Sequence, residues 1–179
     1  ALLNSSYICI SEPCRAGYEC FNRRADFQYM ATAGAAGCPP NETSYAFPYA
    51  GYYVMRDNWH SDAQYLVFDG GCFGAGHPHE DKLNFSLYAH GRPLIIDPGG
   101  YGAFDAFADY FRSSRGHNSL MIDGKGQCRA LMADEDIIPD PDTRWMTTPS
   151  FDSVEGWYKE AYEQGEGSRT GEPPVHQRG

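Results

Sequence analysis

Short runs of alternating hydrophobic and polar residues dominate the middle and the end of the chain. The clearest run is KLNFSLYAHGRPLIID, residues 82–97. Leu83, Phe85 and Leu87 alternate with polar neighbours, which is the pattern of a strand with one buried face. His90-Gly91 has the length and the residue types of a tight two-residue turn. The run therefore predicts an antiparallel hairpin over residues 82–97.

The register of this hairpin determines which residues meet across it. A turn at residues 90–91 places Asp97 across from Asn84, at the open end of the hairpin. The same register predicts that Leu94 and Ile96 face the core together with the leucines of the first strand. Because HPHED, residues 77–81, lies just before Asn84, Asp97 is expected to return close to this polar cluster.

Other segments predict further short strands. GYYVMRD (51–57), AQYLVFDGG (63–71), NSLMID (118–123) and FDSVEGWYKEAY (151–162) are rich in aromatic and β-branched residues. The chain also contains 20 glycines and 12 prolines, which favour many short strands over long helices. The sequence therefore predicts a mostly β domain over residues 45–179, truncated at its C-terminus. Residues 1–44 are expected to form a connecting segment with little regular structure and one short helix around residues 23–33.

Composition excludes some classes of function. The net charge is −10 and the sequence pI is about 4.9, whereas a general nucleic-acid binder needs a basic face. No apolar run approaches the ~20 residues of a membrane span. The first ten residues, ALLNSSYICI, lack the charged region and the cleavage site of a signal peptide. The six cysteines have no C-x-x-C spacing, and their disulfide state does not follow from the sequence.

The cluster HPHED is the main candidate for chemistry. Zinc sites use histidine and carboxylate ligands, three or four in number. His79, Asp97 and His117 all lie at predicted strand ends and form such a set, which leaves His77 free for another role. Alternatively, HPHED is a polar loop in which the imidazoles bond backbone carbonyls. It also matches the start of the H-x-H-x-D-H motif of metallo-β-lactamase-type hydrolases, but Lys82 replaces the last histidine and the motif leads into a hairpin.

Four motifs in order give a wider pattern. They are G-x-G-H-x-H-x-D (residues 74–81), L-x-x-D-P-G (94–99), R-x-x-x-x-H-N (112–118) and D-G-x-x-Q (123–127). Together they resemble the C-terminal half of the heparinase II/III-like polysaccharide lyases, over roughly residues 26–178. That family joins an N-terminal (α/α) toroid to an antiparallel β-sandwich. The resemblance implies that this chain is the all-β antiparallel β-sandwich without the toroid.

The resemblance also implies a site and a reaction. It implies a structural or supporting Zn²⁺ held by His79, Asp97 and His117, with His77 facing the substrate cleft as the catalytic residue. The reaction would be β-elimination on a uronic-acid-containing polysaccharide such as heparin, heparan sulfate, another glycosaminoglycan or alginate. Other members place essential residues in the toroid, so this chain alone is expected to have little activity. A periplasmic or secreted location is implied by the resemblance alone.

Three further residues are candidates for substrate binding. Arg112 and Arg115 have the planar guanidinium that binds a carboxylate with two hydrogen bonds, and Tyr101 has a ring that stacks on sugar. Their alternatives are ion pairs with nearby acids and simple packing. Asp81 is expected either to orient a histidine or to begin the strand. The expected partners are an anionic polysaccharide or oligosaccharide and a second copy of the chain in a homodimer. The alternative function is a non-catalytic carbohydrate-binding or assembly module.

Overall fold

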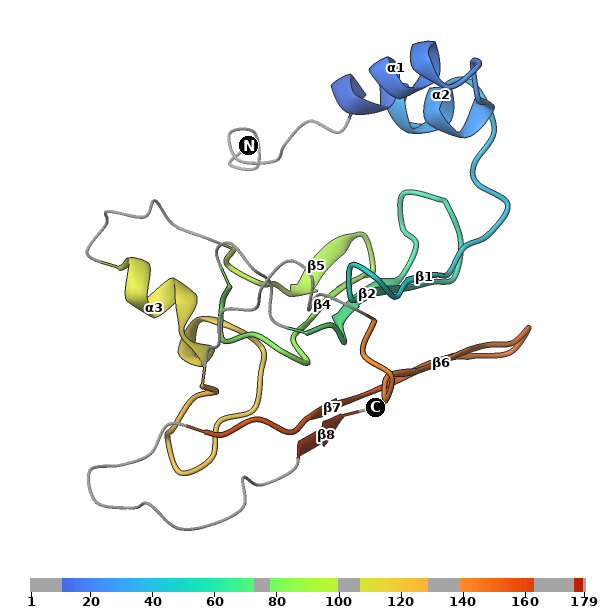
Figure 1. Cartoon of the computed structure of the whole chain (residues 1–179). Helices are drawn as coiled ribbons and strands as arrows, with labels where there is room; N and C mark the ends of the chain where they lie inside the picture. The colour runs from blue at the N-terminus through green and yellow to red at the C-terminus, as the bar shows by residue number, and fades with distance from the viewer. Residues whose placement is uncertain (1–10, 73–77, 100–106, 129–138, 163–175, 179) are drawn as a thin grey trace. The chain divides into compact units, whose positions relative to one another are not determined.

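The computed structural model describes most of the chain as two compact units. The described residues are 11–72, 78–99, 107–128, 139–162 and 176–178. One unit comprises residues 1–43 and the other residues 44–179, and each is described by itself below (Figure 1). Within the described residues, no helix combines the length and the apolar character needed to cross a membrane.

The first unit contains two short helices, α1 (Ser11–Cys20) and α2 (Ala25–Ala31). The rings of Phe21 and Phe27 stack with their centroids 5.7 Å apart. Gly17 allows this packing, because a Cβ atom there would lie 2.8 Å from the Phe27 ring. The helix expected around residues 23–33 corresponds to α2. The helix α1 lies before that segment and has Pro13 in its first turn, where proline is tolerated.

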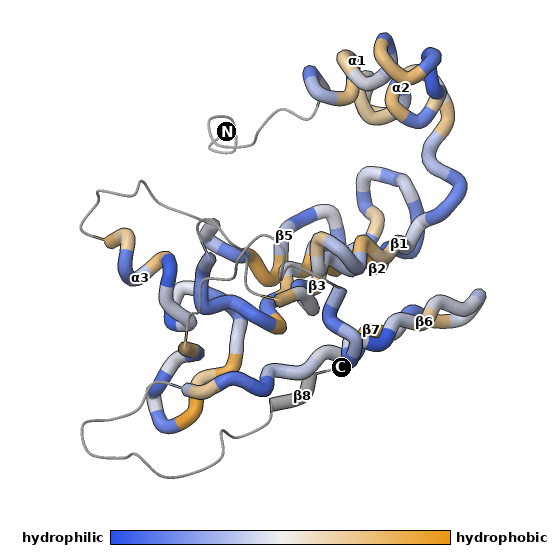
Figure 2. Tube along the Cα trace, in the orientation of Figure 1, coloured by the Kyte–Doolittle hydropathy of each residue, from blue (hydrophilic) through white to orange (hydrophobic). Residues whose placement is uncertain are grey.

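The second unit contains two antiparallel sheets. The first sheet has the order β1 (Tyr45–Phe47), β2 (Tyr52–Arg56), β3 (Tyr65–Asp69), β4 (Phe85–Ala89) and β5 (Arg92–Ile95). The second has the order β6 (Arg144–Thr147), β7 (Asp152–Tyr158) and β8 (His176–Arg178). Hydrophobic positions lie mainly on the first sheet, whereas β6 and β7 are mostly hydrophilic (Figure 2).

The core of this unit lies between the two sheets. Tyr53 and Phe68 of the first sheet are buried together with Val154 and Tyr158 of β7. Leu83, which precedes β4, is fully buried among them. A Cβ atom at Gly156 of β7 would lie 2.6 Å from the Leu83 side chain, so only glycine permits this approach. Two antiparallel sheets enclosing one core confirm the predicted all-β antiparallel sandwich.

The hairpin that was predicted from the alternating pattern is present. Ala89 pairs with Arg92, and the turn residues His90 and Gly91 have φ angles of 56° and 70°. Positive φ at both central residues is the signature of the tight turn that suits paired strands. The first strand begins at Phe85, later than predicted, because Leu83 has a φ of 64° and leaves the extended conformation.

Two details of the second strand were predicted wrongly. Leu94 and Ile96 were expected in the core, but they are 43% and 65% exposed. A β-bulge shifts the register between Leu87 and Tyr88, and β5 is an edge strand of its sheet. A shift of one residue exchanges the two faces of a strand. Because of this shift, the residues of the second strand that face the core are not those that the predicted register placed there.

Residues 107–128 contain little sheet. They form α3 (Ala108–Arg112) and the 3₁₀ helix η1 (Ser114–Gly116), and α3 is seen in Figure 1. The predicted strand over residues 118–123 was wrong. In its place a single bridge joins Ile122 to Lys125 across a turn at Asp123-Gly124, where both residues have positive φ.

Candidate metal centre

Two histidines and one aspartate meet at the entrance to β4. His79, Asp81 and His117 each offer a ligand atom, and these atoms all lie within 4.8 Å of one another. The rings of His79 and His117 have centroids 5.2 Å apart, and all three side chains are partly buried. Nitrogen and carboxylate ligands at this separation form the kind of group that holds a divalent metal ion.

Asp97 joins this group through His117. Its Oδ2 atom lies 2.7 Å from His117 Nδ1 and accepts a hydrogen bond of 2.6 Å from Asn84 Nδ2. Its Oδ1 atom accepts a hydrogen bond from the Gly99 N–H. The hairpin brings Asp97 beside Asn84, as expected, although the register shift between Leu87 and Tyr88 departs from the predicted pairing. The group of possible ligands therefore contains Asp81 with the two histidines, whereas the predicted ligand Asp97 contacts His117.

Asn118 holds the strand ends that carry these residues. Its N–H donates to Asn84 Oδ1, and its side-chain amide donates to the carbonyls of Phe85 and Ile96 at 3.0 and 2.9 Å. A single side chain therefore links the beginning of β4 to the end of β5, directly after His117 in the sequence. This link gives a physical reason for the His-Asn pair in the third motif.

The charges of the four groups are set by burial and by one another. Burial lowers the pKa of His79, and the nearby charges of His117 and Arg112 lower it further, against the opposing effect of Asp81. Burial also opposes the charged form of His117, but the hydrogen bond and the charge of Asp97 prevail and raise its pKa. Burial raises the pKa of Asp81. For Asp97 burial acts in the same direction, but the bond with His117 prevails and lowers its pKa.

One buried nitrogen atom of the candidate centre supports the presence of a metal site. The Nε2 atom of His117 is buried and has no hydrogen-bond partner among the described residues. A buried polar atom normally has a partner, and a neutral imidazole nitrogen is a common metal ligand. Of the two histidines, His79 has the lowered pKa that favours the neutral, metal-binding form. Two imidazoles with one or two carboxylates suit zinc better than magnesium or calcium, which prefer all-oxygen shells.

The other predicted site residues differ in how the structure places them. His77 and Tyr101 lie outside the described residues. Arg112, at the end of α3, is near enough to His79 for its charge to lower the pKa of that histidine. The guanidinium of Arg115 donates to the carbonyl of Gly124 at 3.0 Å. The charge of Arg112 therefore acts on the candidate centre, whereas Arg115 bonds the carbonyl of Gly124.

Two aspartates near the centre were not predicted as parts of it. Asp81 is the aspartate of the H-x-H-x-D motif, two residues after His79, and this spacing was the available signal. Asp69 is at the end of β3 and had no such signal. Burial raises the pKa of Asp69 to about 7, and the charge of Asp81 adds to this effect. The two carboxylates approach each other only through the pairing of β3 with the segment before β4.

We expect Asp69→Asn to stabilise the metal-free protein at pH 8 and to have almost no effect at pH 4. The unfolded Asp69 loses its proton near pH 4, whereas the folded one keeps it up to about pH 7. Stability that is present below pH 4 is therefore lost between pH 4 and 7, by up to about 4 kcal/mol. Asparagine cannot ionise and avoids this loss. Urea unfolding in the presence of a chelator gives the free energy of unfolding of the variant and the wild-type chain at both pH values. If the variant differs from the wild type by the same amount at pH 4 and pH 8, the prediction is wrong.

The chain is similar to proteins of one known family. The family model described as heparinase II/III-like, C-terminal, matches residues 39–164. A heparin-sulfate lyase of Pedobacter heparinus is 31% identical over 103 residues, which are 55% of this chain and 16% of that protein. A heparin-sulfate lyase of Bacteroides stercoris is 28% identical over 110 residues, which are 59% of this chain and 16% of that protein. The chain thus spans about one sixth of the length of these relatives.

Solved structures agree with the sequence relatives. The crystal structure of a heparan sulfate lyase mutant from Pedobacter heparinus has a TM-score of 0.67 and 25% sequence identity, covering 81% of this chain and 22% of that one. Heparan sulfate lyase from the same organism has a TM-score of 0.68 and 24% identity, covering 82% of this chain and 22% of that one. The second likeness supports the fold alone.

Proposed function

The chain belongs to the heparinase II/III-like C-terminal domain family, and on this basis we propose that it is part of a polysaccharide lyase. The reaction that we propose is β-elimination on a uronic-acid-containing glycan. The observation that carries the proposal is the convergence of His79, Asp81 and His117 inside the family domain. Carbohydrate binding alone would not require such a group.

The same proposal includes a supporting zinc ion. His79 and His117 would hold it, and Asp97 would be the third ligand, with Asp81 close enough to be a fourth or to replace it. The pairing of Asp97 with His117 Nδ1 at 2.7 Å is compatible with two roles, either direct ligation or orientation of the imidazole from behind. When bound, the ion would join the loop before β4 to the loop after α3 and supply a fixed positive charge.

The chain's own residues would handle the proton and the substrate charge. β-Elimination removes the weakly acidic C5 proton of the uronate and breaks the bond to O4. His77, two residues before His79, would move the proton as a general base or acid. Arg112, whose charge acts on His79, would stabilise the negative charge that develops on the uronate carboxylate. Arg115 and Tyr101 remain proposed contacts for more distant sugars.

The names of the relatives narrow the expected substrate. Two relatives are heparin-sulfate lyases, so we propose a glycosaminoglycan of the heparin or heparan sulfate class first and alginate second. A protein that meets such polymers works outside the cytoplasm, and we propose a periplasmic or secreted location for this reason. A homodimer remains a further prediction.

A second candidate function rests on the outer face of the first sheet. Tyr45, Phe47 and Tyr52 lie there with exposed fractions of 55%, 49% and 49%, and the rings of Tyr45 and Phe47 are 4.9 Å apart. Exposed rings of this kind bind the apolar faces of sugars. A carbohydrate-binding module without catalysis would use this face and would leave the histidine cluster unused.

One assay separates the two functions. We expect the protein that carries this chain to convert heparan sulfate or heparin into products with the ultraviolet absorbance of an unsaturated uronate, and residues 1–179 alone to give little of this product. Alginate and a neutral glucan serve as comparison polymers. Binding to heparan sulfate without any absorbing product, in the longer protein as well, would favour the binding module.

A further inference from the structure

The segment that carries His79 and Asp81 is held in place by two buried polar side chains from distant loops. Ser114 and Gln127 are 1% and 0% exposed. Neither carries charge, and neither belongs to the group that would hold a metal. We propose that Gln127, assisted by Ser114, is a positioning residue that fixes the ligand segment in its metal-binding form. This inference rests on the metal site that is part of the proposed function.

Gln127 pairs with the backbone of Lys82 as one strand pairs with another. Its Oε1 atom accepts from the Lys82 N–H at 3.0 Å, and its Nε2 atom donates to the Lys82 carbonyl at 2.8 Å. Lys82 lies directly after Asp81 and directly before Leu83, whose φ of 64° reverses the chain. The amide therefore fixes both backbone polar groups at the point where the ligand segment turns into the core.

Ser114 fixes the other side of Asp81. Its hydroxyl donates to the Glu80 carbonyl at 2.7 Å and accepts from the Gln127 N–H at 2.9 Å. Its own N–H donates to Glu80 Oε2 at 3.2 Å, while the Glu80 N–H donates to the Arg112 carbonyl. Asp81 thus lies between two residues whose backbones are both bonded.

Alternate side chains of residues 79–82 have different partners. His79 and Asp81 belong to the candidate metal group. Glu80 bonds Ser114, and the Lys82 ammonium bonds Glu160 at 2.9 Å. Residues at even positions are therefore held by protein, and residues at odd positions are presented to the metal.

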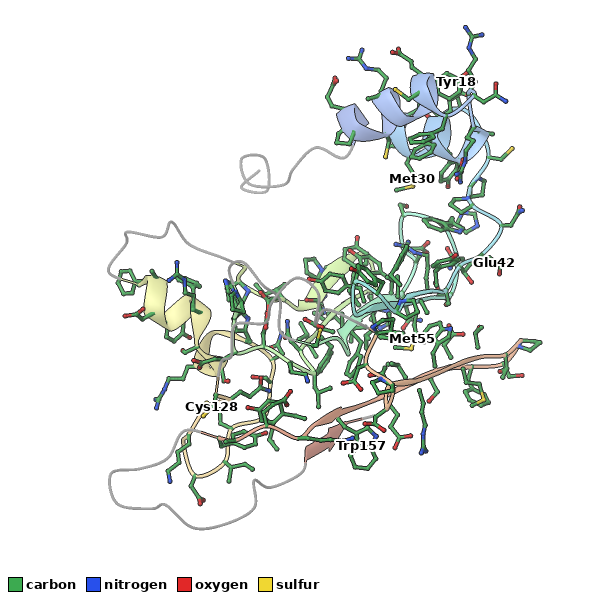
Figure 3. The ribbon with its side chains drawn as sticks, viewed as in Figure 1. Tyr18, Met30, Glu42, Met55, Cys128 and Trp157 are labelled. Carbon is green, nitrogen blue, oxygen red and sulfur yellow. The ribbon has the colours of Figure 1, made fainter. Side chains whose placement is uncertain are left out.

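Gln127 can act as a fixed support because its own backbone is anchored. It forms a bridge with Tyr162, and the next N–H, of Cys128, donates to the Ala161 carbonyl at 2.8 Å and to the Tyr158 hydroxyl at 3.0 Å. Cys128 marks this loop in Figure 3. The end of β7 in the second sheet therefore supports the ligand segment through one glutamine.

The test is metal affinity, measured independently of lyase activity. Gln127→Met keeps most of the side-chain volume and removes both bonds to Lys82, and Ser114→Ala is a second, smaller change. The control is Met55→Ala, a core truncation on β2, labelled in Figure 3. Co²⁺ is titrated into each variant of the chain at a temperature where its circular dichroism is native, and the visible absorption of the bound ion is recorded.

We expect the Kd for Co²⁺ to rise by about 10- to 100-fold in Gln127→Met, the usual effect of a group that orients ligands, with a changed visible spectrum. Ser114→Ala should show a smaller change in the same direction, and it carries the test if Gln127→Met does not fold. Met55→Ala should lose stability but keep the Kd and the spectrum. Wild-type affinity and spectrum in both polar variants would overturn the inference and leave the lyase proposal intact. Absence of Co²⁺ binding by the wild-type chain would overturn both the inference and the metal site.

Discussion

Replacement of His77 by alanine is expected to lower kcat by ~10²–10⁴-fold in the active form of the protein, the usual contribution of a positioned acid or base. The bound metal and the fold should be unchanged, because His77 is proposed to face the substrate and not the metal. The measurement is the rate of formation of the unsaturated uronate on heparan sulfate, together with the metal content of the purified variant.

His60→Ala is the matched control for this experiment. His60 is an exposed histidine in the turn before β3, and its loss should leave the rate unchanged. If His77→Ala retains near-normal turnover on the polysaccharide that the wild-type protein cleaves best, His77 is not the catalytic residue. A variant that loses metal and activity together would instead place His77 among the ligands.

The sequence was most informative where a local rule determines the structure. The turn at His90-Gly91 requires positive φ at two consecutive positions, and both residues adopt it. That turn placed β4 beside β5, and Asn84 bonds Asp97, but the register shift between Leu87 and Tyr88 was not predicted. The strands β2, β3 and β7 also followed from alternation and aromatic content, since both properties are local.

The errors arose where a distant contact overrides the local pattern. Alternation placed Leu94 in the core, but Leu94 is the extra residue of β5 at the register shift, and β5 is an edge strand, so Leu94 is exposed. Leu83 was predicted inside a strand, yet Gln127 and the Asp69 carbonyl hold it in a left-handed turn. Contacts between residues this far apart in sequence have no local signature, so periodicity alone does not reveal them.

The candidate centre shows the same division. The H-x-H spacing and the hairpin predicted His79 and Asp97 as ligands, and the His-Asn motif predicted His117; the two histidines lie in the group of possible ligands, and Asp97 contacts His117. Asp81 was interpreted only as a supporting residue, whereas its carboxylate lies with both histidines. Its position depends on the bonds that hold the segment after it, which the motif does not contain. The sequence therefore predicted the neighbourhood of the centre better than the role of each carboxylate.

Removal of either histidine ligand is expected to abolish high-affinity metal binding and to lower stability at the same time. His79→Ala or His117→Ala deletes a proposed direct ligand, so the affinity for Zn²⁺ should fall by more than the roughly 10- to 100-fold that loss of an orienting partner costs. Metal that binds only the folded state stabilises it, and the melting temperature measured with excess Zn²⁺ should approach that of the chelated wild-type chain. His60→Ala again provides the control.

The same measurement of Zn²⁺ affinity distinguishes the role of Asp97 from that of Asp81. The pairing of Asp97 with His117 Nδ1 leaves the buried Nε2 atom of that ring for the metal if Asp97 only orients the ring. In that case Asp97→Asn should weaken Zn²⁺ binding by about 10- to 100-fold, and Asp81→Asn should weaken it more. If Asp97 is itself the ligand, the order of the two effects reverses. Competition with a chromophoric chelator gives both affinities, and wild-type affinity in His79→Ala and His117→Ala would exclude the centre altogether.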